Sequence, residues 1–240
     1  MNTMNTIDET TSLGDLVTAH PELARQLERL GLDYCCGGAR SLAAACTERG
    51  LDAPAVAGQL ADAITGGGAE VWSTMGAAEL VDHLEATHHR YLHEELPRLS
   101  ALVAKIVTVH GERHPELTAI AACYEEIRAD LEPHLMKEER ILFPMIRELA
   151  VATGPTSFHC GSLRNPISVM LSEHDAVGAL LARLRHLTGD YVPPADGCAS
   201  YLACFAGLAE LEADTHLHIH KENNLLFPQV VRLEAELAAR

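Results

Sequence analysis

Two segments of this sequence repeat one pattern of residues that could bind a metal. The first begins at His134 and the second at His218, 84 residues later, and both read H-x-x-K-E-x-x-x-L-F-P. Residues four positions apart on a helix lie on one face, about one turn from each other. Each segment therefore places its histidine beside a carboxylate, that of Glu138 or Glu222. Such a pair can bind a first-row transition metal from one helix wall.

Two isolated histidines extend the repeat. His89 precedes the first segment by 45 residues and His174 precedes the second by 44, so the order is H…HxxxE…H…HxxxE. This is a two-helix unit used twice, and four-helix bundles build dinuclear sites from ligands on facing helices. Four imidazoles and two carboxylates favour iron or manganese over zinc, which prefers a closed tetrahedron of fewer ligands. We therefore predict two metal ions bridged by two glutamates, with coordination positions left for a small ligand.

Helical phase separates these candidates from most of the other histidines, of which the chain has 14 in all. The apolar phase favours His88 about as much as His89, and the 85-residue spacing between His89 and His174 favours His89. His216 and His220 also lie four positions apart, but their side of the helix lacks large apolar residues. The first segment contains no counterpart of that pair, so we expect both to lie on the surface.

The sequence as a whole predicts helices. Ala and Leu dominate, aromatic residues make up 4%, and strand signals are absent, which indicates an all-α protein. A triple glycine at 66–68 predicts a linker between a small helical domain at 1–68 and a four-helix bundle at 75–240. Pro144 and Pro228 fall inside predicted helices, where each is expected to kink its helix or end the regular part. The four bundle helices are predicted near 76–109 (bent at Pro97), 116–149, 166–188 and 198–238.

Composition narrows the possible partners and the compartment. The chain carries 34 acidic residues against 18 Lys and Arg, a formal net charge of −16, which disfavours nucleic acid and anionic membranes. Its start lacks the basic and apolar regions of a secretory signal, and no apolar run approaches the roughly 18 residues of a membrane span. The seven cysteines are irregularly spaced and do not indicate a disulfide framework. We expect a soluble protein of the reducing cytoplasm.

The order H…HxxxE…H…HxxxE in a four-helix bundle resembles the hemerythrin-like domain. Hemerythrin has a further histidine four residues after its third-helix ligand, where this chain has Gly178. Hemerythrin also ends with an aspartate ligand, where this chain has Glu222. Because a ligand is missing, these departures argue against simple reversible oxygen carriage.

A loop near the start of the chain reads D-Y-C-C-G-G at 33–38. Taken alone, this loop favours a buried structural pair of cysteines. It also extends the resemblance beyond the bundle. Further matching segments are N-P-I-S-V-M at 165–170, E-H-D at 173–175 and E-N-N at 222–224. Together with the repeated metal-binding pattern, they make the chain similar to the iron–sulfur cluster repair di-iron proteins. The resemblance covers nearly the whole chain, from about residue 13 to residue 230.

The resemblance implies an oxo-bridged centre of two iron ions, with Cys35 and Cys36 as a thiol pair. Gly37 and Gly38 would leave the two sulfurs sterically open, as thiol chemistry requires. It also implies a stress-response role in the bacterial cytoplasm, where iron–sulfur proteins damaged by nitric oxide or oxidants would be the clients. The implied iron ligands, in which both glutamates bridge, are His89, His134, Glu138, His174, His218 and Glu222.

The residues leave three functions open. The centre could supply or manage iron for cluster repair, or it could act as an enzyme that reduces or scavenges nitric oxide. Alternatively it could sense oxygen or nitric oxide, with the small domain docking a partner. Glu139 and Glu173, each beside a candidate ligand, either orient ligands or relay protons at the centre, or are solvated charges on a helix. A homodimer formed through the thiol loop is a further hypothesis.

Overall fold

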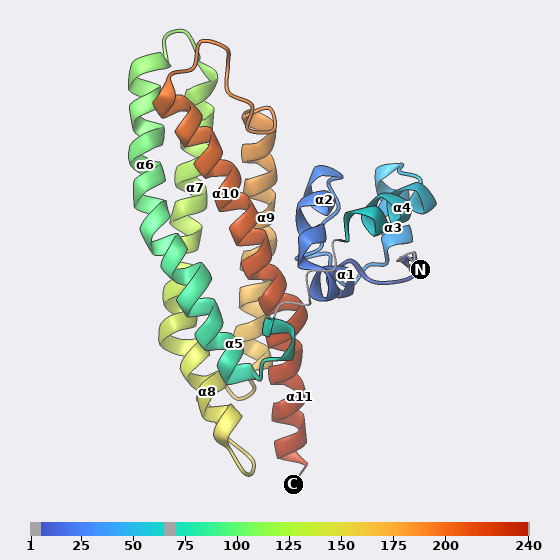
Figure 1. The fold of residues 1–240 in the computed structure, drawn as a ribbon. Coiled ribbons are helices and arrows are strands. Elements are labelled where there is room, and N and C mark those ends of the chain that lie inside the picture. Colours follow the sequence, from blue (N-terminus) through green and yellow to red (C-terminus); the bar gives the residue numbers. More distant parts are fainter. Residues whose placement is uncertain (1–5, 65–70, 240) are drawn as a thin grey trace.

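The computed structural model describes residues 6–64 and 71–239, and all regular secondary structure in these ranges is helical (Figure 1). This confirms the predicted all-α fold. The triple glycine at 66–68, predicted as a linker, lies outside the described residues. No helix in the described ranges combines the length and the apolar character needed to cross a membrane.

A small helical unit forms the N-terminal part. Ser12 and Ser41 cap two of its helices by accepting hydrogen bonds from the backbone N–H groups of Asp15 (3.0 Å) and Ala44 (3.3 Å). The apolar core of this unit includes Ile219, which belongs to the bundle, so the unit packs against the bundle. Its elements are α1 (Leu13–Ala19), a 3-10 turn (Pro21–Leu23), α2 (Ala24–Arg29), α3 (Leu42–Arg49) and α4 (Ala53–Ala63).

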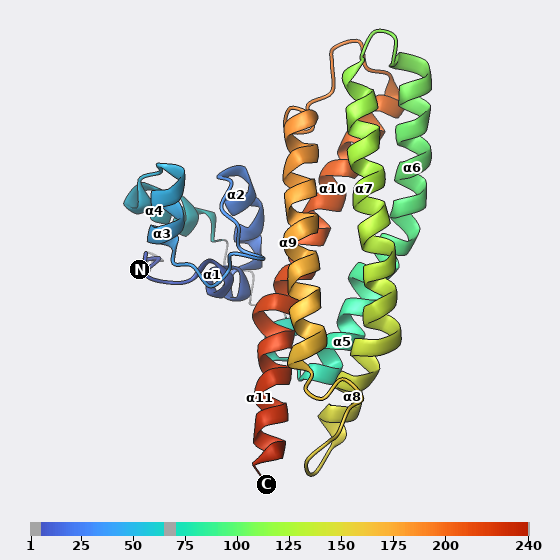
Figure 2. The same cartoon turned by 180° about the vertical axis from the view of Figure 1, so that it is seen from behind.

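Seven helices build the rest of the chain into an elongated bundle (Figures 1 and 2). Three rods of the bundle each consist of two helices in line, and α9 is the fourth rod. In both views the small unit lies beside α9 and α10. The helices are α5 (Ala77–Leu84), α6 (Arg90–His110), α7 (Glu116–Lys137), α8 (Phe143–Val151), α9 (Arg164–Leu187), α10 (Ala199–Lys221) and α11 (Phe227–Ala238).

A five-residue π-helical segment interrupts each of the three composite rods, at Glu85–His89, Glu138–Leu142 and Glu222–Leu226. The predicted helices near 76–109, 116–149 and 198–238 are therefore each divided into two, and the second and third end their first regular part shortly before Pro144 and Pro228. Pro144 and Pro228 follow the second and third segments as the second residues of α8 and α11, where the missing proline N–H is tolerated. A π turn inserts one residue into the helix, which hydrophobic periodicity does not reveal.

The apolar core of the bundle forms two clusters, one on each side of a polar layer. One cluster consists of side chains from α6, α7, α9 and α10, including Leu99 and Ile120. The other consists mainly of side chains from α5, α8 and α11, with contributions from the start of α9, and includes Phe143 and Phe227. Each of the three π segments lies where these clusters meet, and each contains a candidate ligand. The two clusters therefore enclose the candidate ligands from both ends.

A cysteine with an activated thiol lies at the end of the bundle remote from these ligands. Cys198 is exposed, forms the N-cap of α10, and accepts a hydrogen bond from His110 Nε2 (3.2 Å). Arg113 donates to His110 Nδ1 (3.4 Å), and arginine has no acceptor, so the ring proton lies on Nε2. The hydrogen bond from His110 lowers the pKa of Cys198 to about 7. Sequence analysis assigned neither residue a role.

We expect the alkylation rate of Cys198 to rise with pH about a midpoint near 7, because the thiolate is the nucleophile and forms above the pKa. Iodoacetamide labelling followed by peptide mass spectrometry measures the rate at this residue. In His110→Phe, which keeps a ring but removes the donor, the midpoint should move up toward the usual range of a thiol. An unchanged midpoint in that variant would show that His110 does not lower the pKa.

Candidate metal centre

The structure brings all six candidate ligands together in two groups. The donor atoms within each group lie within 4.8 Å of one another, and none of the six residues is more than 2% exposed. Glu138 and Glu222 belong to both groups, which is the arrangement expected when two carboxylates bridge two metal ions. The sequence left open which histidines share a metal. The groups are His89, His218, Glu138 and Glu222, and His134, His174, Glu138 and Glu222.

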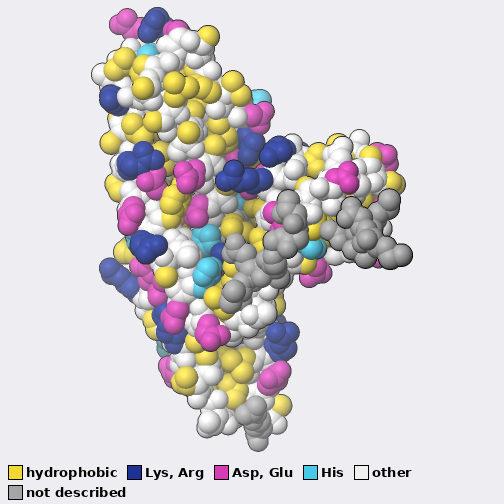
Figure 3. Space-filling view, in the orientation of Figure 1, with side chains coloured by type: hydrophobic (Ala, Val, Ile, Leu, Met, Phe, Trp, Pro, Cys, Tyr) yellow, Lys and Arg dark blue, Asp and Glu magenta, His cyan; other side chains and the backbone are white. Residues whose placement is uncertain are grey.

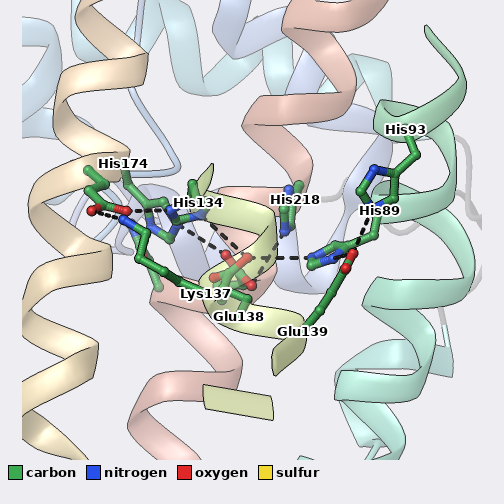
Figure 4. Close-up of polar contacts among 11 residues, drawn as sticks. His89, His93, His134, Lys137, Glu138, Glu139, His174 and His218 are labelled. Carbon is green, nitrogen blue, oxygen red and sulfur yellow. Dashed lines mark hydrogen bonds and ion pairs between the residues drawn. The ribbon is translucent and has the colours of Figure 1, made fainter. Parts of the chain in front are cut away.

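The contacts within the groups match the spacing of ligands on a common ion (Figure 4). Glu138 Oε2 lies 3.5 Å from His89 Nε2 and 3.4 Å from His134 Nε2. Glu222 lies 3.1 Å from His174 Nε2 through Oε2 and 3.4 Å from His218 Nε2 through Oε1. With metal–ligand bonds of about 2.1 Å, neighbouring ligands lie about 3.0–3.4 Å apart. The observed separations of 3.1–3.5 Å fit this value closely.

Several of these donor atoms are buried without a hydrogen-bond partner among the described residues. They include both carboxylate oxygens of Glu138 and of Glu222, and Nε2 of His89 and of His218. A buried carboxylate is strongly unfavourable unless it is paired or bound to a metal. The four residues that carry these atoms come from three different helix rods, and their side chains meet in the same layer of the bundle. This donor set therefore fits a pair of dications.

The protonation of His134 and His174 supports the same conclusion. His134 Nδ1 donates to the carboxylate of Glu173 (2.9 Å), and His174 Nδ1 donates to Asn223 Oδ1 (2.7 Å). Nε2 is then the atom of each ring that is left to bind a metal, and the two Nε2 atoms lie 3.2 Å apart. This separation is typical of two ligands on one ion. Both rings are thus oriented to bind metal through Nε2.

Burial sets the charges of the candidate ligands. Burial lowers the pKa of His134 and of His218 to about 4, which keeps both rings in the neutral form that binds metals. Burial and the negative charge of Glu222 raise the pKa of Glu138 well above its usual range. Burial opposes ionisation of Glu222 as well, but His218 and His174 outweigh it and hold its pKa well below the usual range.

Residues next to the candidate ligands orient ligands on other helices. Glu139, which follows Glu138, accepts a hydrogen bond from His89 Nδ1 (2.9 Å), and Glu173 does the same for His134. Asn223 occupies the position of Glu139 in the second repeat and accepts from His174. Glu139 and Glu173 thus contact the centre and are not merely solvated charges. Asn223 was missed as an orienting residue, although its place in the repeat was a usable signal.

We expect Glu173→Gln and Glu139→Gln each to weaken metal affinity by about 10- to 100-fold, the usual effect of losing a carboxylate that orients a histidine. Competition with a chelator of known affinity measures the change. Glu126→Gln is the matched control, because Glu126 lies on α7 with a half-exposed side chain and pairs with Arg183 away from the centre. Equal affinities in all three variants would contradict the orienting role.

The structure distinguishes His89 from His88, the alternative that phase left open. His88 is also buried, but its Nδ1 donates to Asp214 (2.8 Å) and its Nε2 accepts from Lys221 (2.9 Å). Both ring nitrogens are therefore engaged, and His89 is the residue that joins the group of donors. Burial lowers the pKa of His88 to about 3, so this ring is neutral too.

The prediction that His216 and His220 lie on the surface was wrong. His220 is fully buried, with Nδ1 3.3 Å from the carbonyl of Tyr34 and Nε2 3.3 Å from the hydroxyl of Thr18. His216 is partly buried and lies 3.6 Å from Glu28. All three partners belong to the small unit. Because that unit covers a second side of α10, the phase of the bundle core alone did not predict the burial.

The thiol loop is closed more tightly than predicted. Asp33 accepts the backbone N–H groups of Cys35 and Cys36 (3.0 Å each) and of Gly37 (2.8 Å). Cys35 is only 5% exposed, as expected for a buried cysteine pair, so the prediction of open sulfurs was wrong for this residue, whereas Cys36 is partly exposed. A Cβ on Gly38 would lie 2.4 Å from Asn224 Oδ1. The glycine thus permits close contact with the bundle instead of exposing the thiols.

Two adjacent asparagines connect this loop to the metal centre. Asn224 Nδ2 donates to the carbonyl of Cys35 at 3.0 Å, and Asn223 Nδ2 reaches the same carbonyl at 3.4 Å. Because the Oδ1 atom of Asn223 accepts from His174, one amide side chain spans the loop and a candidate ligand. The loop and the centre are therefore neighbours.

A four-helix bundle with four histidines and two shared glutamates defines a hemerythrin-like metal-binding protein. In agreement, residues 80–230 match the family model described as hemerythrin HHE cation binding domain. Residues 9–64 match a second family model, ScdA_N, described as a domain of unknown function (DUF542).

Relatives with both parts identify the family more closely. The chain is 36% identical to "Iron-sulfur cluster repair protein YtfE" of Enterobacter sp. (strain 638) over 219 residues, which cover 91% of this chain and 96% of the relative. It is 35% identical to the protein of the same name from Citrobacter koseri and 34% identical to that from Escherichia coli O81, with the same coverage. This chain belongs to the family of YtfE iron–sulfur cluster repair proteins, which confirms the resemblance drawn from the sequence.

Proposed function

We propose that this protein repairs iron–sulfur clusters damaged by nitric oxide or oxidants, using an oxo-bridged di-iron centre to supply or manage iron. The observation that carries the proposal is the pair of donor groups that share two buried glutamates. The names of the relatives, which are iron–sulfur cluster repair proteins, support the same function. The iron ligands would be the six residues of the two groups. The clients would be damaged iron–sulfur proteins of the bacterial cytoplasm.

The residues of the chain have defined parts in this function. The two irons, when bound, supply a redox-active centre with room for a small ligand. Burial keeps His134 and His218 neutral for binding, and Glu139 and Glu173 hold the proton of their histidine partners on Nδ1. The apolar clusters on either side exclude water from the donor layer. We also propose 1–68 and 75–240 as two domains, the first presenting Cys35 and Cys36 beside the centre.

The test is recovery of a dehydratase whose four-iron cluster has been damaged by nitric oxide, followed anaerobically with purified protein. We expect wild type to restore activity and His134→Ala/Glu138→Ala to fail, with loss of its iron. Cys35→Ser/Cys36→Ser should retain two irons but restore little activity if the thiols take part. Absence of recovery with the iron-loaded wild type would refute the proposal.

Reduction of nitric oxide is the second candidate function, and one observation favours it. Gly178, one turn after His174, supplies no donor atom, so the two groups contain only six protein ligands, and two metal ions bound there would have coordination positions left for a small ligand. If this function holds, the iron-loaded protein should consume nitric oxide in repeated turnovers with a chemical reductant. That turnover should survive in Cys35→Ser/Cys36→Ser, whereas repair should not.

A further inference from the structure

The side chains of the thiol loop have the spacing of ligands on a single metal ion. Cys35 Sγ and Cys36 Sγ lie 3.9 Å apart, and Asp33 Oδ1 lies 3.2 Å from Cys35 Sγ. Two thiolates on a tetrahedral ion, with bonds of about 2.3 Å, lie about 3.8 Å apart. The three donor atoms all fall within 4.8 Å of one another. They are separate from the two groups of donors in the bundle.

The arrangement is held in place from both sides. Side chains of adjacent residues in an extended chain point in opposite directions, so the loop must turn for both sulfurs to meet. Asp33 produces this turn by accepting the backbone N–H groups of both cysteines and of Gly37. From the bundle, Asn224 donates to the carbonyl of Cys35 (3.0 Å). The donors are therefore positioned before any ion arrives, which reduces the cost of ordering them.

An acidic cavity of about 740 Å³ opens onto these donors between the loop and α9. In the space-filling view the small unit projects from the bundle, and Lys and Arg side chains are the most visible charged groups at the notch between the two (Figure 3). Arg185 donates to both carboxylate oxygens of Glu212 (3.1 and 2.6 Å), so its charge is largely neutralised. The charged lining of the cavity therefore favours a cation. It has five carboxylates and two guanidinium groups, those of Glu28, Asp33, Asp175, Asp190 and Glu212, and of Arg49 and Arg185.

The loop also lies directly against the helix that carries a candidate iron ligand. A Cβ on Gly178 would lie 3.9 Å from Cys36 Sγ, and Gly178 is one turn after His174 on α9. Asn223 contacts both the carbonyl of Cys35 and the ring of His174. An ion held by the loop would thus be close to the centre on one side and to the cavity on the other.

We propose that Asp33, Cys35 and Cys36 form a second metal site, which takes one thiophilic divalent transition-metal ion and leaves its fourth position open to the cavity. On binding, the ion forms two metal–sulfur bonds and displaces one proton from each thiol, and no electrons are transferred. The assignment of iron as the natural ion, in transit between the centre and a client, rests on the proposed function. The metal site itself does not.

Anaerobic titration with Co²⁺ of protein already loaded with iron tests the site. We expect about one further ion per chain, a sulfur-to-cobalt charge-transfer absorption, and release of about two protons per ion. The centre in the bundle has no sulfur ligand and cannot produce this absorption. Cys35→Ser/Cys36→Ser should abolish the absorption while keeping its iron and helical circular dichroism, and Cys160→Ser/Cys198→Ser, the matched control, should retain it. Asp33→Asn should keep the absorption and weaken Co²⁺ binding by about tenfold or more.

No sulfur-to-cobalt absorption in the wild type, or equal absorption in Cys35→Ser/Cys36→Ser, would overturn the second metal site. The result is separable from the repair function. Cluster recovery without Co²⁺ binding at the loop would refute the site and leave repair standing. Co²⁺ binding to the wild type, together with full cluster recovery by Cys35→Ser/Cys36→Ser, would establish the site and show that repair does not need it.

Discussion

Replacing both Glu138 and Glu222 by glutamine is expected to abolish metal retention and, at the same time, to remove the stability that wild type gains from metal. Both carboxylates are fully buried and belong to both groups of donors, so neither ion would keep an anionic ligand. We expect metal affinity to fall by more than about 100-fold, beyond the effect of losing an orienting residue. Metal content after gel filtration measures this loss.

The stability of the same variant should no longer respond to metal. Without metal, wild type keeps two carboxyl groups with unpartnered oxygens in its interior. Glutamine has the same shape and should let the variant fold, but it also loses the contacts that Glu222 makes with His174 (3.1 Å) and His218 (3.4 Å). With metal, wild type gains the binding free energy and should be the more stable protein. Urea unfolding of both proteins, with and without a chelator, gives the four free energies required.

Surface glutamates on the same helices provide the control. Glu126 on α7 and Glu210 on α10 are exposed, so Glu126→Gln/Glu210→Gln should leave metal content and stability within about 0.5 kcal/mol of wild type. If added metal stabilised Glu138→Gln/Glu222→Gln as much as it stabilises wild type, the two carboxylates would not be metal ligands. A metal-binding role would then lose its main physical support.

The second large effect is expected from Gly38→Ala, which should release the thiol loop from the bundle. The added Cβ would lie 2.4 Å from Asn224 Oδ1 and 2.6 Å from the carbonyl oxygen of Tyr34. The second contact is to backbone and cannot be relieved by a change of rotamer, so the loop itself must move. We expect a loss of about 1–3 kcal/mol in the free energy of unfolding. Alkylation of Cys35, now 5% exposed, should accelerate by about tenfold or more.

Gly58→Ala is the matched control for this prediction. Gly58 lies inside α4, and a Cβ there would meet no atom within 4 Å. Alanine should therefore raise stability by about 0.5–1 kcal/mol and leave Cys35 unreactive. Mass spectrometry of the alkylated peptides and urea unfolding compare the two variants. If Cys35 were alkylated equally slowly in Gly38→Ala and wild type, the close contact with Asn224 would not be what holds the loop.

The sequence by itself determined the class of fold, the family and the six candidate ligands. Residues four positions apart share a helix face whatever surrounds the helix, so the pairing of His134 with Glu138 and of His218 with Glu222 could be predicted from spacing alone. The repeat then located His89 and His174, although apolar phase did not separate His89 from His88. The thiol loop was recognisable because adjacent cysteines followed by two glycines form an uncommon pattern.

Contacts between helices were decided only by the tertiary structure. Spacing along one helix does not say which side chains meet across the bundle, so the grouping of His89 with His218 and of His134 with His174 had to come from packing. Hydrophobic periodicity likewise could not predict the π segments or the contact of Asn223 with His174. The burial of His220 and Cys35 depends on the small unit packing against α10. The hydrophobic phase of a single helix does not predict burial by a second unit that covers its other side.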